Sequence, residues 1–329
     1  MTYVRFALSA LAIIVGGILL AEFGDVIAVR TRLGRFLFGT ILLATSTTLP
    51  ELVAAFSAVG LGVPELAVGN LLGTCMTDMF FLGILDLASR RGPLLRQVAI
   101  NHSLTASLAT LLIGSASFFI LVPLGLQIGT VDLEGLFLVA IFIGGMWLIQ
   151  RRVRAMPSIS EAQVPRRISL PVAIAGYAAA TVLLVVAGPV LVSSAEAIAA
   201  QTGLAVGLIG VSLFPLITSM PELISSVVAV RIGAYDLAVG NLLGSCVLNA
   251  SALGLVSLFF SGSLFSSVSP GFVAVGLLAL ILVNWALLGT LANFEWRPLN
   301  IEWDAAIIIL IYLAGTYLLF RQGLLSAVR

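Results

Sequence analysis

Three acidic residues lie inside long hydrophobic stretches of the sequence, where a charge is costly. They are Glu51, Asp78 and Glu222, and the amide Asn249 occupies the position that matches Asp78 in a second copy of the same motif. A charge at the centre of a bilayer costs at least about 2.5–3.5 kcal/mol on insertion scales, and residues that carry one commonly mark an ion pathway. Carboxylate and amide oxygens bind hard cations such as Ca²⁺. These four residues therefore predict a cation site.

Hydroxyl side chains accompany the four residues at a fixed spacing. A Thr or Ser precedes each acid or amide by four positions, and residues four apart share one face of a helix. These hydroxyl residues are Thr47, Thr74, Thr218 and Ser245, with Thr48 and Ser219 as further hydroxyls just before the two glutamates. Four such faces would form an oxygen-rich cage, which suits Ca²⁺ with its roughly six to eight oxygen ligands. The sequence has no Cys-His cluster, so we expect no soft-metal chemistry.

A proline directly precedes each of the two glutamates. Inside a helix, Pro50 and Pro221 each remove a backbone hydrogen bond and leave a carbonyl about one turn earlier without its donor. Such a carbonyl is tolerated at membrane depth where it faces a cavity or an ion. We therefore expect the backbone of residues 44–47 and 215–218 to contribute carbonyl oxygens to the site.

All of these residues lie within an internal repeat. Residues 39–78 align without a gap with residues 210–249, and residues 67–73 are identical to residues 238–244. Seven consecutive identities in a gapless alignment indicate a true repeat and not a composition bias. The cation site is therefore expected to receive the same kinds of ligand from both halves of the chain.

The identical part of the repeat contains small and polar residues with expected packing roles. Its glycines are four positions apart, which permits close helix approach; they are Gly69, Gly73, Gly240 and Gly244. Asn70 and Asn241 either line the site or bond a neighbouring helix. Cys75 and Cys246 are expected to be small, inert, buried residues.

The composition indicates a polytopic membrane protein. Hydrophobic residues make up 60% of the chain and charged residues only 9%, whereas a soluble domain has about a quarter charged residues. We expect an all-α protein with ten membrane-spanning helices and no enzymatic activity. The expected spans are 4–24, 36–60, 64–88, 97–122, 131–150, 169–192, 203–230, 236–260, 269–291 and 302–320.

The arginines predict the orientation of these spans. All sixteen basic residues are arginines, and thirteen of them lie in the odd-numbered loops. By the positive-inside rule these loops are cytoplasmic and both termini lie outside. Residues 1–150 (core motif 39–86) and 169–329 (core motif 210–257) then form two five-helix repeats joined by the cytoplasmic linker 151–168. Because five is odd, the second repeat is inverted, an arrangement typical of secondary transporters with a site at the midplane.

Charge arithmetic favours an antiporter over other transport classes. Three ionised carboxylates would be largely neutralised by one Ca²⁺ or by two to three Na⁺, but not by both loads together. A channel would need a continuous pore, which broken inverted repeats disfavour. No nucleophile or base stands beside an orienting partner as an enzyme would require, and no basic patch suggests nucleic acid. The residues alone therefore indicate a cation antiporter that needs no cofactor.

The motifs TTLPEL at residues 47–52 and TSMPEL at residues 218–223, each followed by AVGNLLG, resemble the two alpha repeats of the sodium/calcium exchanger family. The resemblance implies a central site that binds Ca²⁺ and Na⁺ alternately. It assigns this site to Glu51, Asp78, Glu222 and Asn249, to the six hydroxyl residues named above, and to the backbone carbonyls of Ala44 and Pro215. It also implies that the first and sixth spans slide over the others as gates.

The resemblance further implies a direction of transport. We expect Ca²⁺ export driven by Na⁺ entry, with an H⁺-coupled or K⁺-dependent exchanger as the alternative. The partners are then the transported cations and the lipid bilayer. The expected location is the inner membrane of a prokaryotic cell, and the expected functional unit is a monomer.

Overall fold

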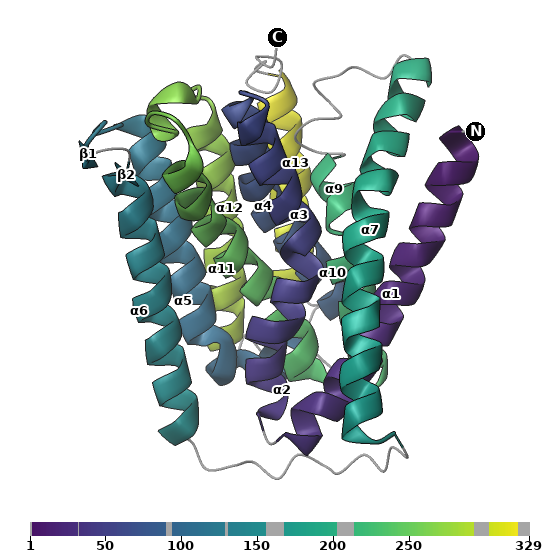
Figure 1. Ribbon diagram of the computed structural model, residues 1–329. Helices are drawn as coiled ribbons and strands as arrows, with labels where there is room; N and C mark the ends of the chain where they lie inside the picture. The colour runs from purple at the N-terminus through teal and green to yellow at the C-terminus, as the bar shows by residue number, and fades with distance from the viewer. Residues whose placement is uncertain are drawn as a thin grey trace.

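The computed structural model describes residues 2–31, 33–89, 94–128, 131–155, 168–202, 214–292 and 303–321. Long helices run side by side through most of the molecule (Figure 1). In the first half the elements are α1 (Thr2–Arg30), α2 (Gly34–Leu37), the π-helix η1 (Phe38–Leu43), α3 (Ala44–Gly60), α4 (Pro64–Ala88), α5 (Leu94–Leu121), β1 (Gln127–Ile128), β2 (Val131–Asp132) and α6 (Leu133–Ala155). In the second half they are α7 (Leu170–Thr202), α9 (Phe214–Thr218), α10 (Met220–Arg231), α11 (Tyr235–Phe259), the 3₁₀ turn η3 (Phe265–Ser267), α12 (Phe272–Ala292) and α13 (Trp303–Arg321).

Nine of the ten expected spans correspond to long apolar helices. Within the described ranges, nine helices are long and apolar enough to cross a membrane. The seventh expected span, 203–230, starts outside the described residues, and its described part is divided between α9 and α10. Helix α6 continues into the first residues of the expected linker, 151–155; residues 156–167 of the linker lie outside the described ranges. The two-residue strands β1 and β2 pair antiparallel and are too short to leave a sequence period.

The two ends of the described chain lie at the same end of the molecule. The start of α1 and the end of α13 both lie in the upper part of the view, whereas α6 ends and α7 begins at the bottom (Figure 1). This arrangement matches an even number of crossings, as the ten expected spans require.

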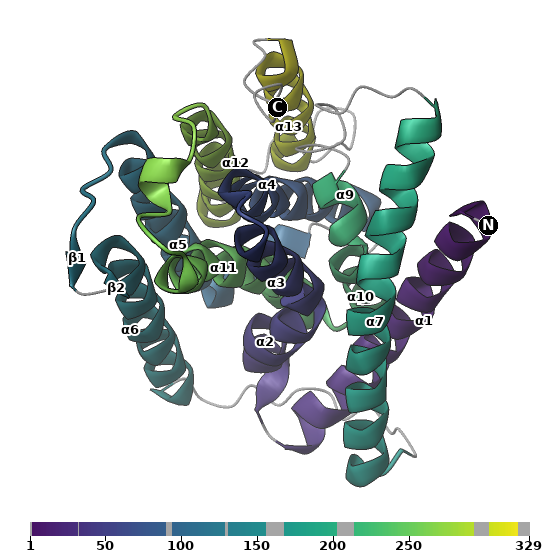
Figure 2. The same ribbon diagram turned by 45° about the horizontal axis from the view of Figure 1, so that its top comes forward.

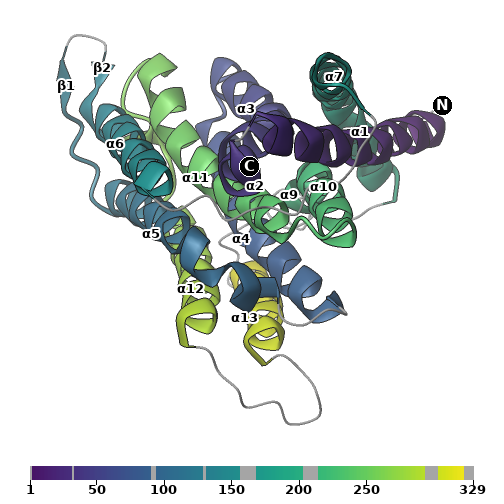
Figure 3. The same ribbon diagram turned by 90° about the horizontal axis from the view of Figure 1, so that it is seen from below.

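Helices α4 and α11 form the centre of the molecule. Seen from below, α1 and α7 lie to one side of them and α5 and α6 to the other (Figure 3). In the tilted view α1 and α7 run together along one edge (Figure 2). The central pair carries two of the four predicted central residues, Asp78 and Asn249, while α1 and α7 pack against each other outside it.

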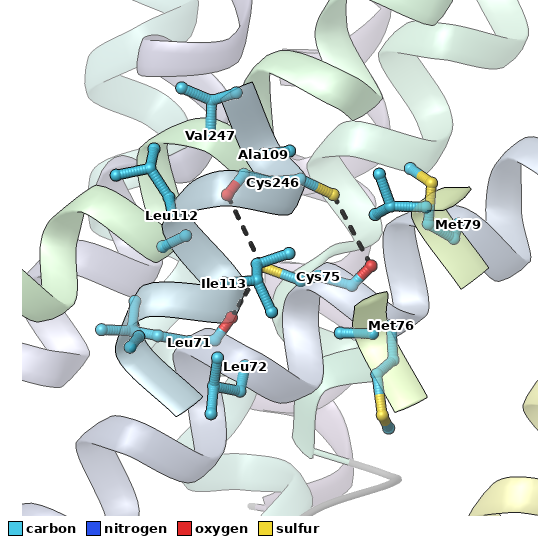
Figure 4. Packing of buried hydrophobic residues seen from close by; sticks show 14 of the residues in the cluster. Leu71, Leu72, Cys75, Met76, Met79, Ala109, Leu112, Ile113, Cys246 and Val247 are labelled. Atoms are coloured by element: carbon cyan, nitrogen blue, oxygen red, sulfur yellow. Dashed lines mark hydrogen bonds between the residues drawn. The ribbon is translucent and has the colours of Figure 1, made fainter. Parts of the chain in front are cut away.

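The two cysteines meet where α4 and α11 cross (Figure 4). The Sγ of Cys75 lies 3.6 Å from the carbonyl oxygen of Cys246, and the Sγ of Cys246 lies 3.6 Å from the carbonyl oxygen of Cys75. Leu112 and Ile113 of α5 pack around this contact. Both cysteines are fully buried and free, so at this point the two repeats touch through equivalent positions.

The two copies of the repeated motif fold differently. In the first copy the helix runs without a break from Gly34 to Gly60 and contains Pro50. In the second copy the helix is interrupted at one residue, Ser219, so that Pro221 lies in the first turn of α10; the backbone hydrogen bonds from Ser219 to Pro215 and from Leu223 to Ser219 are kept. Proline lacks a backbone donor and is tolerated in a first turn, where no donor is needed. The same motif thus gives a continuous helix in one half and an interrupted one in the other.

Candidate cation site

The four predicted central residues come from four different helices and are all fully buried. Glu51 lies on α3, Asp78 on α4, Glu222 on α10 and Asn249 on α11. The three carboxylates are close enough to repel one another. Since like charges in a low-dielectric interior are strongly unfavourable, this grouping requires compensation. The structure therefore brings together acids from two motifs that lie 171 positions apart in the chain.

Several oxygens of this group have no hydrogen-bond partner among the described residues. A buried acceptor left unpaired costs about 1–3 kcal/mol, and more when it is charged. Other buried acids have partners: Asp25 forms an ion pair with Arg35 at 2.6 Å, and Glu134 accepts hydrogen bonds from the backbone of Leu124 and Gly125. The unpaired oxygens of the site are both Oε atoms of Glu51, Oδ1 of Asp78, Oε2 of Glu222, Oδ1 of Asn249, and the hydroxyls of Thr74 and Ser219.

This donor set is suited to a hard cation. It consists of carboxylate, amide and hydroxyl oxygens, which are the ligands that Ca²⁺ and similar ions prefer. Within the described part of the chain, no three Asp, Glu, His or Cys side chains converge closely enough to hold one metal ion together. A bound cation would therefore combine one or two carboxylates with hydroxyl and amide oxygens.

The hydroxyls of Thr48 and Thr218 lie beside the glutamate of the opposite repeat, while on α11 the hydroxyl of Ser245 bonds Asn249, four positions later. The hydroxyl of Thr48 lies 3.4 Å from Oε1 of Glu222 and 3.2 Å from the Oγ of Ser245. Thr218 in turn faces Glu51 without completing a hydrogen bond to it. The cause is the inversion of the repeat: the two helices approach in opposite directions, so the segment before one glutamate lies beside the other glutamate.

The α11 side of the site is connected by hydrogen bonds. The Nδ2 of Asn249 donates to the Oγ of Ser245 at 3.1 Å, and Ser245 also lies beside Asp78. On α4 the equivalent Thr74 hydroxyl has no partner among the described residues. The hydroxyl of Ser245 on α11 is therefore hydrogen-bonded, whereas the hydroxyl of the equivalent Thr74 on α4 has no partner among the described residues.

The carbonyls of Ala44 and Pro215, which the resemblance names as ion ligands, each accept a hydrogen bond from the hydroxyl three residues later. The hydroxyl of Thr47 lies 3.1 Å from the Ala44 oxygen, and the hydroxyl of Thr218 lies 3.2 Å from the Pro215 oxygen. The Pro215 oxygen also accepts the backbone N–H of Ser219 at 2.9 Å. Each carbonyl is thus covered by the hydroxyl three residues later, and its role as an ion ligand stays a prediction.

The two asparagines of the repeated motif differ in their surroundings. Asn241 bonds neighbouring helices: it donates to Ser225 at 3.0 Å and to Ser226 at 3.1 Å, and lies 3.1 Å from the hydroxyl of Thr47. Both polar atoms of the buried Asn70 have no partner in the ranges that the structure describes. For Asn241, the second of the two alternatives is therefore the correct one.

Sequence reasoning missed two contributors to this region. The thiol of Cys246 lies 3.9 Å from Oδ2 of Asp78, so it is buried as expected but adjoins the site. Ser225 and Ser226 were not singled out, although they bond Asn241. A comparison of the copies shows a difference here, because residues 54 and 55, the counterparts of the serines in the first repeat, are both alanine, but it does not show what the serines bond.

Comparison with known proteins agrees with the fold and the repeat. The family model "Sodium/calcium exchanger protein" matches residues 1–150 and 172–321. The chain is 28% identical over 240 residues to the inner membrane protein YrbG of Escherichia coli K12, covering 69% of this chain and 70% of the relative. It is 25% identical over 307 residues to the putative antiporter CaxA of Alkalimonas amylolytica, covering 90% and 91%.

Solved structures of the sodium-calcium exchanger NCX_Mj share the fold. One, soaked with 2.5 mM Na⁺ and 0.1 mM Sr²⁺, has a TM-score of 0.72 at 19% identity and covers 96% of this chain and 99% of that one. Another, soaked with zero Na⁺ and Ca²⁺, has a TM-score of 0.71. The prediction of an all-helical membrane fold is confirmed. The chain belongs to the sodium/calcium exchanger protein family and is an integral membrane cation/calcium antiporter, not an enzyme.

Proposed function

We propose that this protein exchanges Ca²⁺ for Na⁺ across the membrane by alternating access, with Ca²⁺ export driven by Na⁺ entry. The observation that carries the proposal is the group of buried oxygens without partners, among the described residues, on Glu51, Asp78 and Glu222. Such oxygens are satisfied when a cation binds among them. The proposed ligands are these acids with Asn249, the hydroxyls of Thr47, Thr48, Thr74, Thr218, Ser219 and Ser245, and the carbonyls of Ala44 and Pro215.

Alternate binding of the two ions follows from the charge of the site. Three buried carboxylates without a cation repel one another. The change of conformation that turns the empty site from one side of the membrane to the other is therefore unfavourable. Either one Ca²⁺ or a group of Na⁺ relieves this repulsion, whereas both together would leave an excess of positive charge. Movement of the loaded site with either cargo, and not of the empty site, is what couples the two fluxes.

The different folding of the two repeats supports alternating access. Helix α3 is continuous through Pro50, whereas the second copy is interrupted at Ser219. In an inverted repeat, exchange of these two conformations between the halves would open the site to opposite sides of the membrane. Helices α1 and α7 pack together outside the central helices and are the proposed gates (Figure 2).

The arginine pattern supports a proposed orientation. We place the odd-numbered loops in the cytoplasm and both termini outside, in the inner membrane of a prokaryotic cell, with a monomer as the transport unit. The proposed domain division is two inverted five-helix units, 1–150 and 169–329. The similarity to YrbG, an inner membrane protein, agrees with this location.

Uptake into proteoliposomes tests the coupling ion. Vesicles that contain the full chain are loaded with Na⁺ and diluted into Na⁺-free buffer with ⁴⁵Ca²⁺, in parallel with vesicles that carry a pH gradient or a K⁺ gradient. We expect Ca²⁺ uptake only with the Na⁺ gradient. Uptake that follows the pH gradient and ignores Na⁺ would replace this proposal with H⁺-coupled exchange, and a strict need for K⁺ would indicate the K⁺-dependent form.

A further inference from the structure

We propose that Asn241 is a positioning residue for Glu222, and that Ser225 and Ser226 make this support specific to the second repeat. The inference rests on the proposed function, because it concerns the placement of a proposed ligand. It gives the two asparagines of an identical motif different roles.

The carboxamide of Asn241 connects three helices. Its Nδ2 lies 3.0 Å from the Oγ of Ser225 and 3.1 Å from the Oγ of Ser226, both on α10. The same nitrogen lies 3.3 Å from the backbone carbonyl of Glu222. On the other side of the carboxamide, Oδ1 lies 3.1 Å from the hydroxyl of Thr47 on α3. A fully buried residue of α11 thereby joins the turn that carries Glu222 to the helix of the other repeat.

The turn that carries Glu222 follows an interruption of the helix. Ser219, the residue between α9 and α10, has φ −82° and ψ 11°, outside helix geometry, although its backbone N–H still bonds the Pro215 carbonyl at 2.9 Å. Ser225 adds to the support, since its Oγ lies 2.7 Å from the Pro221 carbonyl and 3.2 Å from the Glu222 carbonyl. Together, Asn241 and Ser225 hold the backbone from which the carboxylate projects.

The hydroxyl partner of Glu222 is held by the same carboxamide. Thr47, which lies beside Oδ1 of Asn241, directly precedes Thr48, whose hydroxyl lies 3.4 Å from Oε1 of Glu222. Loss of Asn241 therefore removes one constraint on the glutamate backbone and another on the residue next to its hydroxyl partner. Side chains that bind an ion depend on neighbours of this kind to hold them in the binding geometry.

The first repeat lacks this arrangement. The positions equivalent to Ser225 and Ser226 are Ala54 and Ala55, and neither polar atom of Asn70 has a partner among the described residues. Glu51 lies within the uninterrupted helix α3, whereas Ser219, which is outside helix geometry, lies three residues before Glu222. The two glutamates are thus placed by different means, one by an unbroken helix and one by a side-chain network.

Ca²⁺ binding to the purified full chain in Na⁺-free detergent tests the inference without depending on the driving ion. For Asn241→Ala we expect Ca²⁺ binding to weaken by about tenfold or more, since several buried hydrogen bonds are lost and a tenfold change corresponds to about 1.4 kcal/mol. For Asn70→Ala, the matched change in the first repeat, we expect a shift of less than about threefold, because no hydrogen bond to a described residue is removed. Ser251→Ala on α11, whose hydroxyl bonds the Leu248 carbonyl at 2.8 Å, controls for general loss of a buried polar group.

Coupling between the substitutions separates positioning from general stability. The double variant Ser225→Ala/Ser226→Ala reproduces the alanines of the first repeat and is expected to weaken Ca²⁺ binding in the wild-type background. In the Asn241→Ala background the same double change should have little further effect, because the network is already broken. In ⁴⁵Ca²⁺ uptake, the concentration for half-maximal rate should rise much more than the maximal rate falls.

Specific results would overturn the inference. A lower melting temperature for Asn241→Ala with unchanged Ca²⁺ affinity, or equal affinity losses for Asn70→Ala and Asn241→Ala, would mean that Asn241 is only structural. If Asn241→Ala does not fold, additive effects of Ser225→Ala and Ser226→Ala on melting alone, with normal affinity, lead to the same conclusion. Glu222→Gln is tested alongside: if it still binds and transports Ca²⁺, the proposed site fails, whereas if only the Asn241 results fail, the site stands without this support.

Discussion

The hydroxyl of Thr48 in the first repeat lies 3.4 Å from Oε1 of Glu222 in the second repeat. The two residues are 174 positions apart and meet only because the repeats are inverted and packed against each other. Each half therefore completes the surroundings of the other half's acid. A cation site of this kind depends on both repeats at once.

Thr48→Val removes this hydroxyl at nearly constant volume. We expect Ca²⁺ affinity to fall by about two- to tenfold, because an intramolecular hydrogen bond contributes about 0.5–1.5 kcal/mol net. Ser219→Ala, the counterpart change, removes a hydroxyl that is a proposed ligand and has no partner among the described residues, so Ca²⁺ affinity should fall here too. Ca²⁺ binding to the two purified variants measures both. Unchanged affinity in both variants would contradict the proposed role of these hydroxyls.

Glu51→Gln and Glu222→Gln keep the size of each side chain and remove its charge. We expect either change to abolish Ca²⁺ exchange in proteoliposomes, because each removes one of three negative charges that compensate the bound cation. Both variants should remain folded, since Gln fits the same space, and their elution as a single species in size-exclusion chromatography checks this. Robust exchange by either variant would refute the proposed site.

The position of the third acid can be exchanged with that of the amide. Asp78→Asn leaves two acids, and we expect Ca²⁺ affinity to fall by about tenfold or more, since a charged ligand is lost. The double variant Asp78→Asn/Asn249→Asp again has three acids and one amide at equivalent positions. We expect it to recover most of the affinity in ⁴⁵Ca²⁺ binding. No recovery would show that the place of the acid, and not the number of charges, decides binding.

Gly244 allows η1 and α11 to approach closely. A Cβ at this position would lie 2.9 Å from the Cβ of Ala44 and would also meet the carbonyl oxygen of Thr40. The three atoms nearest to a Cβ at Gly69 all belong to the ring of Phe272, the far end of a side chain that can move. We expect Gly244→Ala to destabilise the protein by about 1–3 kcal/mol and Gly69→Ala by less. Thermal unfolding in detergent compares them, and equal melting temperatures would be evidence against this contact.

Asp132 lies outside the membrane-spanning helices, at the end of β2. Burial raises the pKa of its carboxyl, so the folded protein binds this proton more tightly than the unfolded chain. Stability attributable to Asp132 is therefore present at low pH and lost as the pH rises from its ordinary pKa through its raised pKa. Asp132→Asn keeps an oxygen for the backbone N–H of Glu134, now 3.1 Å from Oδ1, and should remove this pH dependence from the melting temperature. An unchanged slope would exclude Asp132 as the cause.

Much of the fold was predictable from the sequence, because the length of a hydrophobic run depends on local composition alone. The burial of Glu51 and Asp78 followed from their position within hydrophobic runs. The contact between Thr48 and Glu222 could not be predicted in the same way. The helical period tells on which face of its helix a residue lies, but not which residue of another helix lies opposite. The break at Ser219 was also unpredictable, because Pro50 stands in an equivalent motif and leaves its helix continuous.

The sequence contains a difference that accounts for the different surroundings of Asn70 and Asn241, but it lies outside the identical stretch of the two repeats. Alignment of the copies draws attention to what is identical, and both asparagines lie in the identical stretch. The difference comes from Ala54 and Ala55 against Ser225 and Ser226, which the alignment shows as ordinary divergence. The hydrogen bonds of Asn241 show what this difference does: the two serines give the asparagine of the second repeat partners on α10.

The contact between Cys75 and Cys246 has the form of a subunit interface. Each thiol lies beside the other residue's carbonyl, so residue i meets j and j meets i, as in an isologous contact between identical chains. At this contact the two halves of the single chain are therefore related in the way that the two subunits of a two-fold symmetric homodimer are. A change at either cysteine acts on both halves at their shared axis, next to Asp78, and so cannot be confined to one of them.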